Sequence, residues 1–219
     1  ENNYAFRKPI YANELREHLA TLNIRPKLLA HDVRIAPVIE ELQKQFEESI
    51  RPRLICGNII PREETTKLIE LIRESSDAIL HGTAGNGKSV VLYELTQNFR
   101  LENIPFLPIR LDRREPKNTA AQFGGDMGLP DSPVYSLIAL AGERPCVLLL
   151  DQLDAIRWTS SHSANALDVC KEMFRQVKQL RDGGKRITVV LSCRSFDLEN
   201  DPEIRNWLNT DKTLKKVEV

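Results

Sequence analysis

One stretch of the chain carries residues whose types and spacing suit the binding of a phosphate chain. It reads Gly82-Thr83-Ala84-Gly85-Asn86-Gly87-Lys88-Ser89 and matches the Walker A pattern G-x-x-x-x-G-K-[ST] at every fixed position. Glycines let the backbone curl so that several N–H groups point at one anion, and a following helix adds its positive dipole end. In this pattern the lysine reaches the β- and γ-phosphates, and the serine hydroxyl is a ligand of Mg²⁺. We therefore predict a nucleotide-binding loop at 82–89, continued by Val90 in the first turn of a helix.

A second candidate is an apolar run that ends in an acid. Residues 146–150 read Cys-Val-Leu-Leu-Leu, and Asp151 follows them. A carboxylate at this place emerges at the carboxyl end of a strand, where ligands bind in open α/β sheets. We expect Asp151 to hold Mg²⁺ together with Ser89, directly or through water. Asp154 is a candidate general base for an attacking water, and the alternative role for it is the N-cap of the next helix.

Two further polar residues bear on turnover of a bound nucleotide. Gln152 directly follows Asp151, and a glutamine can orient water but cannot accept a proton at neutral pH. A third apolar run, 187–191, ends in Ser192-Cys193-Arg194. If its strand neighbours the strand before the loop, Arg194 lies beside the γ-phosphate, where a guanidinium can bind the charge in a bidentate way. The alternative is a solvated arginine, so Lys88, Asp151, Asp154 and Arg194 form the candidate catalytic set.

The elements that must position these residues alternate along the chain. Apolar runs predict strands at 77–81, 105–111, 146–150 and 187–192. Helical spacing of apolar residues predicts helices at 61–74, 89–100, 132–141 and 164–181. Between them, 112–130 reads as a looser segment with glycines and a proline. Short leucine or β-branched runs between helices indicate an α/β fold with a parallel sheet covered on both faces. With the loop at 82–89 and the acid at 151, this arrangement resembles the ASCE-type P-loop NTPase fold.

The first quarter of the chain carries no phosphate-binding pattern. Apolar residues recur at helical spacing within 12–22 and 38–50, and prolines separate these stretches. We divide the chain into a helical N-terminal segment or linker at 1–57 and a P-loop NTPase domain at 58–219. The first segment is either a linker from an upstream part or a packing layer for the sheet. Because the chain begins at Glu1 without a methionine, we expect it to be a piece of a longer protein.

Composition bounds the classes of partner and compartment. The chain has 31 Lys and Arg against 31 Asp and Glu, so its net charge does not favour nucleic acid or an acidic membrane. It has no run of about 18 apolar residues that would span a bilayer and no visible signal peptide. Cys56, Cys146, Cys170 and Cys193 show no C-x-x-C spacing, and free thiols in apolar runs behave as small hydrophobes. These features indicate a cytoplasmic protein.

Together the motifs resemble the STAND class of signal-transduction NTPases, which comprises NACHT-like and AP-ATPase-like P-loop switches. The resemblance covers about 59–200 and rests on Ile59-Ile60-Pro61-Arg62-Glu63, the loop at 82–89, the run 146–154 and Val189-Val190-Leu191-Ser192-Cys193-Arg194. In the family the second motif reads as four apolar residues and then Asp-Gly-Leu-Asp-Glu or a relative. This chain keeps both aspartates and departs at Gln152 and Ala155. By the same resemblance, Arg62 is a nucleotide-binding residue close to the adenine.

The resemblance implies a switch controlled by ATP and ADP with Mg²⁺. Such a protein hydrolyses ATP slowly, forms a homo-oligomer with ATP bound, responds to a trigger ligand and controls an effector elsewhere in the full-length protein. Its relatives serve in innate immunity, programmed cell death, transcription control and bacterial antiphage defence. The sequence at 192–197 is most similar to the bacterial members, which implies a role in antiviral defence.

Three other interpretations stay open. A AAA+ replication initiator or loader that acts on DNA shares both Walker motifs, but would carry Glu after Asp151 and a basic DNA-binding element. A small-molecule kinase would need a lid of arginines, for which Arg110, Arg113 and Arg114 are candidates, with a solvated charge run as their alternative. A nucleotide-binding module without turnover would fit Gln152 and the missing glutamate.

Overall fold

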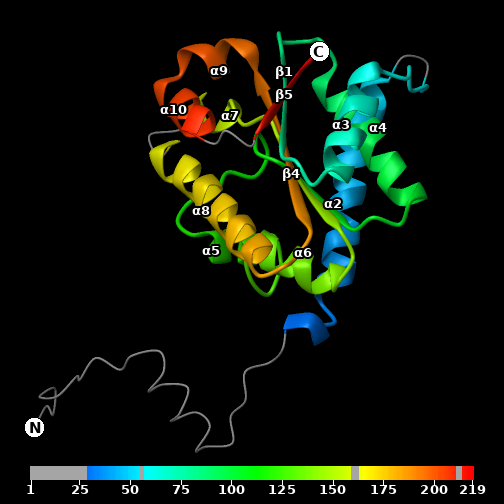
Figure 1. Cartoon of the computed structure of the whole chain (residues 1–219), viewed down its shortest axis with the longest axis vertical. Coiled ribbons are helices and arrows are strands. Elements are labelled where there is room, and N and C mark those ends of the chain that lie inside the picture. Colours follow the sequence, from blue (N-terminus) through cyan, green and yellow to red (C-terminus); the bar gives the residue numbers. More distant parts are fainter. Residues whose placement is uncertain (1–28, 55–56, 159–162, 211–213) are drawn as a thin grey trace, which may run out of the picture.

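A parallel sheet forms the centre of the molecule (Figure 1). The computed structural model describes residues 29–54, 57–158, 163–210 and 214–219. In this part of the chain the strands are β1 (Ala78–Gly82), β2 (Phe106–Arg110), β3 (Cys146–Asp151), β4 (Ile187–Arg194) and β5 (Lys215–Glu218). Their order is β2-β3-β4-β1-β5, and all neighbours are parallel. The helix predicted within 12–22, and Cys56, lie outside the described residues.

Helices cover both faces of this sheet, which confirms the predicted fold class (Figure 1). One face is packed by α3 (Glu63–Arg73) and α4 (Lys88–Leu101). The other face is packed by α5 (Ala120–Asp126), α6 (Pro133–Ala141), α8 (Ser163–Asp182) and α10 (Pro202–Thr210). Every residue of β2 and β3 is buried, as a strand between two helical layers requires.

Helix α2 (Ile35–Ile50) lies along the edge strand β2. Its first apolar residues join one core and its last ones, Phe46 and Ile50, join the other. Gln43 Nε2 donates a buried hydrogen bond of 2.7 Å to the carbonyl oxygen of Phe106 in β2. A helix that covers a sheet edge protects unpaired backbone groups. Of the two roles predicted for the N-terminal segment, packing on the sheet is the one that α2 has, while the division of the chain after residue 57 stays a prediction.

Several short elements differ from the sequence-based expectation. Residues 112–130 were expected to be loose but contain α5, whose Phe123 is buried. The strand β5 and the short helices α7 (Ala155–Trp158) and α9 (Ser195–Asn200) were not predicted. In β5 only Val217 is buried, so the pairing with β1 defines this strand, and a local apolar run does not. Two 3₁₀ turns, η1 (Leu29–His31) and η2 (Arg51–Arg53), flank α2. No helix among the described residues is long and apolar enough to cross a bilayer.

Candidate nucleotide-binding site

The loop at 82–89 joins β1 to α4 and bends back on itself. Gly85 and Gly87 have φ angles of +88° and +90°, in the left-handed region that favours glycine. The amides of Val90 and Val91 donate to the carbonyl oxygen of Gly87 at 2.8 and 3.0 Å, so α4 starts inside the loop. The first amides of a helix have no intrahelical acceptor and carry its positive dipole end. This geometry can hold an anion at the N-terminus of α4.

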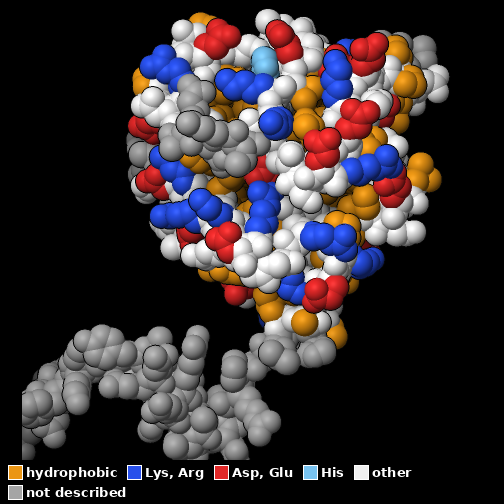
Figure 2. Space-filling view, in the orientation of Figure 1, with side chains coloured by type: hydrophobic (Ala, Val, Ile, Leu, Met, Phe, Trp, Pro, Cys, Tyr) orange, Lys and Arg blue, Asp and Glu red, His pale blue; other side chains and the backbone are white. Residues whose placement is uncertain are grey.

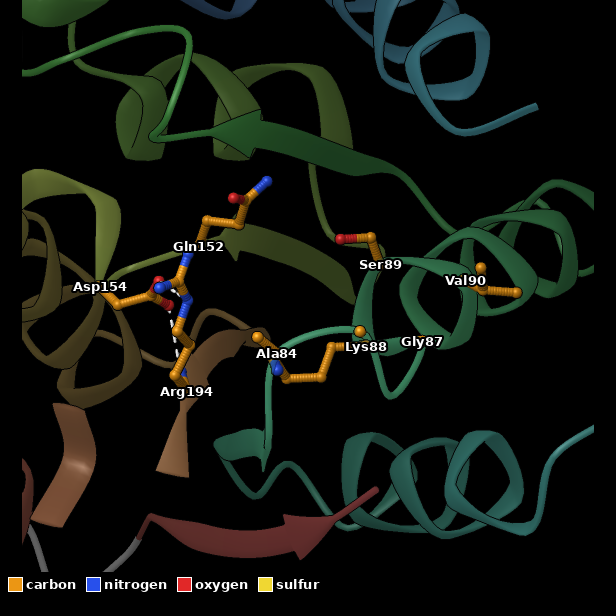
Figure 3. Close-up of a pocket in the computed structure, with 9 residues that line it drawn as sticks. Ala84, Gly87, Lys88, Ser89, Val90, Gln152, Asp154 and Arg194 are labelled. Atoms are coloured by element: carbon orange, nitrogen blue, oxygen red, sulfur yellow. Dashed lines mark hydrogen bonds and ion pairs between the residues drawn. The ribbon is translucent and has the colours of Figure 1, made fainter. Parts of the chain in front are cut away.

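A cavity of about 270 Å³ opens in front of this loop (Figure 3). It is lined by Ala84, Gly85, Gly87, Lys88, Ser89, Val90, Gln152, Asp154 and Arg194. Lys88 lies along the loop, and its Nζ donates to the carbonyl oxygens of Gly82 at 2.9 Å and Thr83 at 2.8 Å. Burial lowers the pKa of the Lys88 ammonium, while the nearby Asp154 opposes this shift. The cavity therefore joins the loop to the residues at the ends of β3 and β4.

Asp151 lies at the end of β3, fully buried behind the loop. Ser89 Oγ donates to its Oδ2 at 3.1 Å, and Ser192 Oγ donates to its Oδ1 at 2.5 Å. Burial raises the pKa of Asp151, and the hydrogen bond from Ser192 and the charge of Arg110 oppose the rise. A hydroxyl and a carboxylate oxygen side by side are hard ligands of the type that Mg²⁺ prefers, so these residues fit that ion.

Asp154 and Arg194 lie side by side on the wall of the cavity opposite Lys88 and Ser89 (Figure 3). The backbone amide of Arg194 donates to Asp154 Oδ1 at 3.1 Å. Arg194 Nε lies 2.9 Å from Asp154 Oδ2, but outside hydrogen-bond geometry, so this contact is an ion pair. The side chain of Asp154 is buried, whereas that of Arg194 is 48% exposed. Burial raises the pKa of Asp154, and the charge of Arg194 opposes the rise.

Strand order decides where Arg194 lies. β4 pairs with β1 and places Arg194 in register with Gly82, the first residue of the loop. The condition on which the sequence prediction depended is therefore met, because β4 is the neighbour of the strand before the loop. Arg62, from the start of α3, lies beside Gly87 on the other side, since a Cβ built on Gly87 would be 3.3 Å from its guanidinium.

Gln152 has an unusual backbone. Its φ angle is +62°, which costs a non-glycine residue about 1 kcal/mol or more. Its amide donates to Ser192 Oγ at 2.9 Å, so Ser192 contacts both Gln152 and Asp151. In Figure 3 the Gln152 side chain extends away from Asp154 and Arg194. Ser192 was not among the site residues predicted from the sequence. Its place as a polar residue near the end of an apolar strand could have indicated it.

Arg110 at the end of β2, and Arg113 and Arg114 after it, do not form a lid over the loop. Arg110 is 5% exposed, so it is neither solvated nor free to move. Arg113 and Arg114 line a separate cavity of about 320 Å³ against helix α2, where Arg114 donates to Gln45 Oε1 at 2.6 Å. The structure thus places these arginines between β2 and α2, and they take no part in the lining of the cavity at the loop.

Comparison with solved structures gives distant similarities. The ORC1 protein of Aeropyrum pernix, solved in complex with DNA, is 16% identical with a TM-score of 0.45, over 74% of this chain and 46% of that one. The Aeropyrum pernix ORC2 protein is 16% identical with a TM-score of 0.47, over 74% and 48%. A chain of the E. coli MS115-1 HORMA:CdnC:Trip13 complex is 15% identical with a TM-score of 0.43, over 87% and 65%. This chain spans about half the length of the two Aeropyrum proteins.

Comparison with the curated proteins found no match. Comparison with models of protein families found one. The model of the ATPase family associated with various cellular activities (AAA) matches residues 78–212, which are more than half of the chain. That range begins at β1 and includes the loop, Asp151, Asp154 and Arg194. The chain therefore belongs to the AAA family of ATPases.

Proposed function

We propose that this chain binds ATP and ADP with Mg²⁺ at the loop 82–89 and hydrolyses ATP slowly, as a nucleotide-controlled switch. One observation carries the proposal. Lys88, Ser89 and Arg194 line a single cavity at the carboxyl ends of neighbouring parallel strands, and Ser89 contacts Asp151 directly. In open α/β sheets ligands bind at this edge.

Each residue has a distinct part in this proposal. The loop amides and Lys88 hold the phosphates, and Arg62 lies where it can contact the nucleotide from the side of α3. Ser89 and Asp151 hold Mg²⁺, which when bound neutralises phosphate charge and polarises the transferred group. The remaining proposed nucleotide contacts come from Gly82, Thr83, Ala84, Gly85, Asn86, Gly87 and Val90.

Arg194 is the residue that would bind the γ-phosphate and so respond to whether ATP or ADP is present. It is half exposed and bound to Asp154, and a terminal phosphate would offer it a second anionic partner in the same cavity. A ligand shifts a two-state element by its differential affinity for the two states. Arg194 would move its guanidinium from Asp154 to the terminal phosphate when ATP is bound, but not when ADP is bound. This movement would change the position of α9, which begins at the next residue.

Slow turnover follows from the same contacts. Asp154 is the candidate general base, but its carboxylate already binds the amide and guanidinium of Arg194. Gln152 stands directly after Asp151 and cannot accept a proton. A water in this cavity therefore has a base only while Arg194 is turned away from Asp154.

The direct test is nucleotide binding by calorimetry. We expect Lys88→Ala to abolish binding of ATP and ADP, because it removes the ammonium that contacts the phosphates. Lys178→Ala is the matched control, since Lys178 is an exposed lysine on α8, on the other face of the sheet. Unchanged affinity in Lys88→Ala would contradict the proposed site.

The narrower proposal is a STAND-type switch that oligomerises with ATP and controls an effector in a longer protein, with antiviral defence as its role. What supports it is the resemblance of the motifs, including both aspartates at 151 and 154. Light scattering tests it, because the mass of the full-length protein should rise with ATP and its trigger but not with ADP. A full-length protein that stays monomeric in every nucleotide state would contradict this version.

A AAA+ ATPase that acts on DNA is the second candidate, and one local feature favours it. Lys171, Arg175 and Lys178 line a groove of about 870 Å³ between α8 and Trp207 of α10. Figure 2 shows Lys and Arg side chains over α8, with acidic side chains among them. A salt-dependent DNA shift that Arg175→Glu with Lys178→Glu abolishes would support this candidate. No shift at low salt would contradict it.

A further inference from the structure

Arg110 is a buried arginine next to the carboxylate that the proposed function gives to Mg²⁺. Its Nε and one terminal nitrogen donate to both carboxylate oxygens of Asp112, at 3.0 and 2.7 Å. The other terminal nitrogen donates to Ser49 Oγ of helix α2 at 3.0 Å. Its Nε also lies 4.0 Å from Asp151 Oδ2. One guanidinium thus contacts helix α2, the segment directly after β2 and the end of β3.

The backbone of β2 holds Asp151 at the same place. Arg110 pairs in register with Asp151, and the amide of Leu111 donates to the carbonyl oxygen of Asp151 at 3.0 Å. On the carboxylate itself, Ser192 contacts Oδ1, while Ser89 and Arg110 face Oδ2. The orientation of the Asp151 side chain is therefore set from three directions.

The choice of arginine, and its pairing, suit this position. The planar fork of a guanidinium is rigid, and Asp112 sets its orientation through two hydrogen bonds. Asp112 also balances the charge of Arg110. The pair can therefore orient Asp151 without placing an unbalanced positive charge beside a metal ion.

We propose that Arg110 is a positioning residue for Asp151, and that through Ser49 it couples helix α2 to the Mg²⁺ site. This inference rests on the proposed function, because it takes Ser89 and Asp151 as the metal ligands. Groups that orient a metal ligand from behind typically change metal affinity by about 10–100-fold when they are removed. Helix α2 thereby becomes an element whose movement changes how tightly the nucleotide is held.

The experiment compares two arginines that both bind α2. Arg110→Met removes the group beside Asp151. Arg100→Met is the matched control. Arg100 lies in helix α4, its Nε donates to Glu47 Oε1 of α2 at 2.7 Å, and it has no described contact with Asp151. Calorimetry of the 219-residue chain then measures ATP affinity in EDTA and at increasing Mg²⁺ concentration.

The expected result separates positioning from stability. For Arg110→Met, ATP affinity in EDTA should stay within about twofold of the wild type, while the Mg²⁺ concentration for half-maximal enhancement rises about tenfold. Arg100→Met should leave both values unchanged. A Mg²⁺ dependence that does not change in Arg110→Met, or changes equally in both variants, overturns the inference while leaving nucleotide binding in place.

Ser49→Ala and Arg110→Lys keep the test decisive if Arg110→Met does not fold. Ser49→Ala removes the link between Arg110 and α2, together with the hydrogen bond from Ser49 Oγ to the carbonyl oxygen of Phe46. Arg110→Lys keeps the charge but cannot bind Asp112 and Ser49 together as the fork does. Both should raise the Mg²⁺ requirement, by less than Arg110→Met. Wild-type Mg²⁺ dependence in both overturns the inference. A wild-type chain that binds no ATP with or without Mg²⁺ overturns the proposed function itself, and the inference with it.

Discussion

Asp154 lines the cavity and Asp151 is buried behind the loop, and burial raises the pKa of each carboxyl group. A carboxyl whose pKa is raised binds more protons in the folded than in the unfolded chain. Without metal, each therefore lowers stability as the pH rises from the unfolded value, about 3.9, through the raised folded value. The charge of Arg110 relieves part of this cost at Asp151 and that of Arg194 relieves part of it at Asp154, and a bound Mg²⁺ would relieve more. The site is thus expected to be less stable empty than filled.

The first prediction concerns this pH dependence. Asp151→Asn removes the buried charge, while its amide oxygen can still accept from Ser192 Oγ and its amide nitrogen can donate to Ser89 Oγ. In EDTA, the free energy of unfolding of the variant minus that of the wild type should increase with pH between about pH 4 and pH 8, in favour of the variant. Urea unfolding across this range measures the difference. If the difference does not depend on pH, ionisation of the buried Asp151 does not lower the stability of the folded chain.

The second prediction concerns the missing base. Gln152→Glu places a carboxylate directly after Asp151, on a backbone that Ser192 already holds at φ +62°. Because a positioned general base contributes about 10²–10⁴-fold, ATP turnover should rise at least about tenfold. Phosphate release with Gln152→Ala as the control measures it, since alanine also removes the amide but supplies no base. Equal rates in the glutamate and alanine variants would mean that this side chain does not reach the reacting water.

At the scale of elements, α5 shows how tightly the segment after β2 is packed. Its two glycines are adjacent but not equivalent. A Cβ on Gly124 would be 1.9 Å from the carbonyl oxygen of Asp131, whereas a Cβ on Gly125 has nothing within 4 Å. Gly124 is therefore required by the close approach of α5 to the start of α6, and Gly125 is not.

These glycines give a matched pair of variants. Gly124→Ala should lower the free energy of unfolding by about 1–3 kcal/mol, because the backbone must move to admit the methyl group. Gly125→Ala should raise it by about 0.5 kcal/mol, since alanine loses less entropy in a helix. Chemical denaturation compares both with the wild type. A similar effect of the two substitutions would show that α5 does not pack on Asp131 in this way.

At the scale of the whole molecule, helix α2 joins the two cores at the edge of the sheet. It buries Ile35, Ile39, Leu42, Phe46 and Ile50. Burial of a large apolar side chain contributes about 1.5–3 kcal/mol, so five of them contribute about 10 kcal/mol. That is comparable to the total stability of a domain, about 5–15 kcal/mol. The helix is therefore part of the structural unit that carries the site.

The burial of α2 against both cores predicts the result of truncation. A chain of residues 58–219 should lose cooperative thermal unfolding or become insoluble, because β2 and both cores lose their cover. A chain of residues 29–219 keeps every contact described for α2 and should unfold cooperatively. Circular dichroism and calorimetry distinguish the two. A stable, cooperative 58–219 chain would instead support a domain boundary after residue 57.

The sequence by itself determined the loop at 82–89, the main strands and the α/β class. These are local features, because consecutive residues carry a Walker pattern or an apolar run, and neighbouring apolar runs and helices imply a covered parallel sheet. Asp151, Asp154 and Arg194 were also predicted as separate candidates, since each directly follows or lies close to the end of such a run.

Only the tertiary structure decided which of these residues meet. The position of β4 between β1 and β3 brings Arg194 to Asp154, although 39 residues lie between them in the sequence. The burial of Arg110 under α2, the contact of Ser192 with Asp151 and the strand β5 likewise depend on partners far along the chain. Strand order results from hydrogen bonds and packing between distant segments, and no local pattern of residues encodes it.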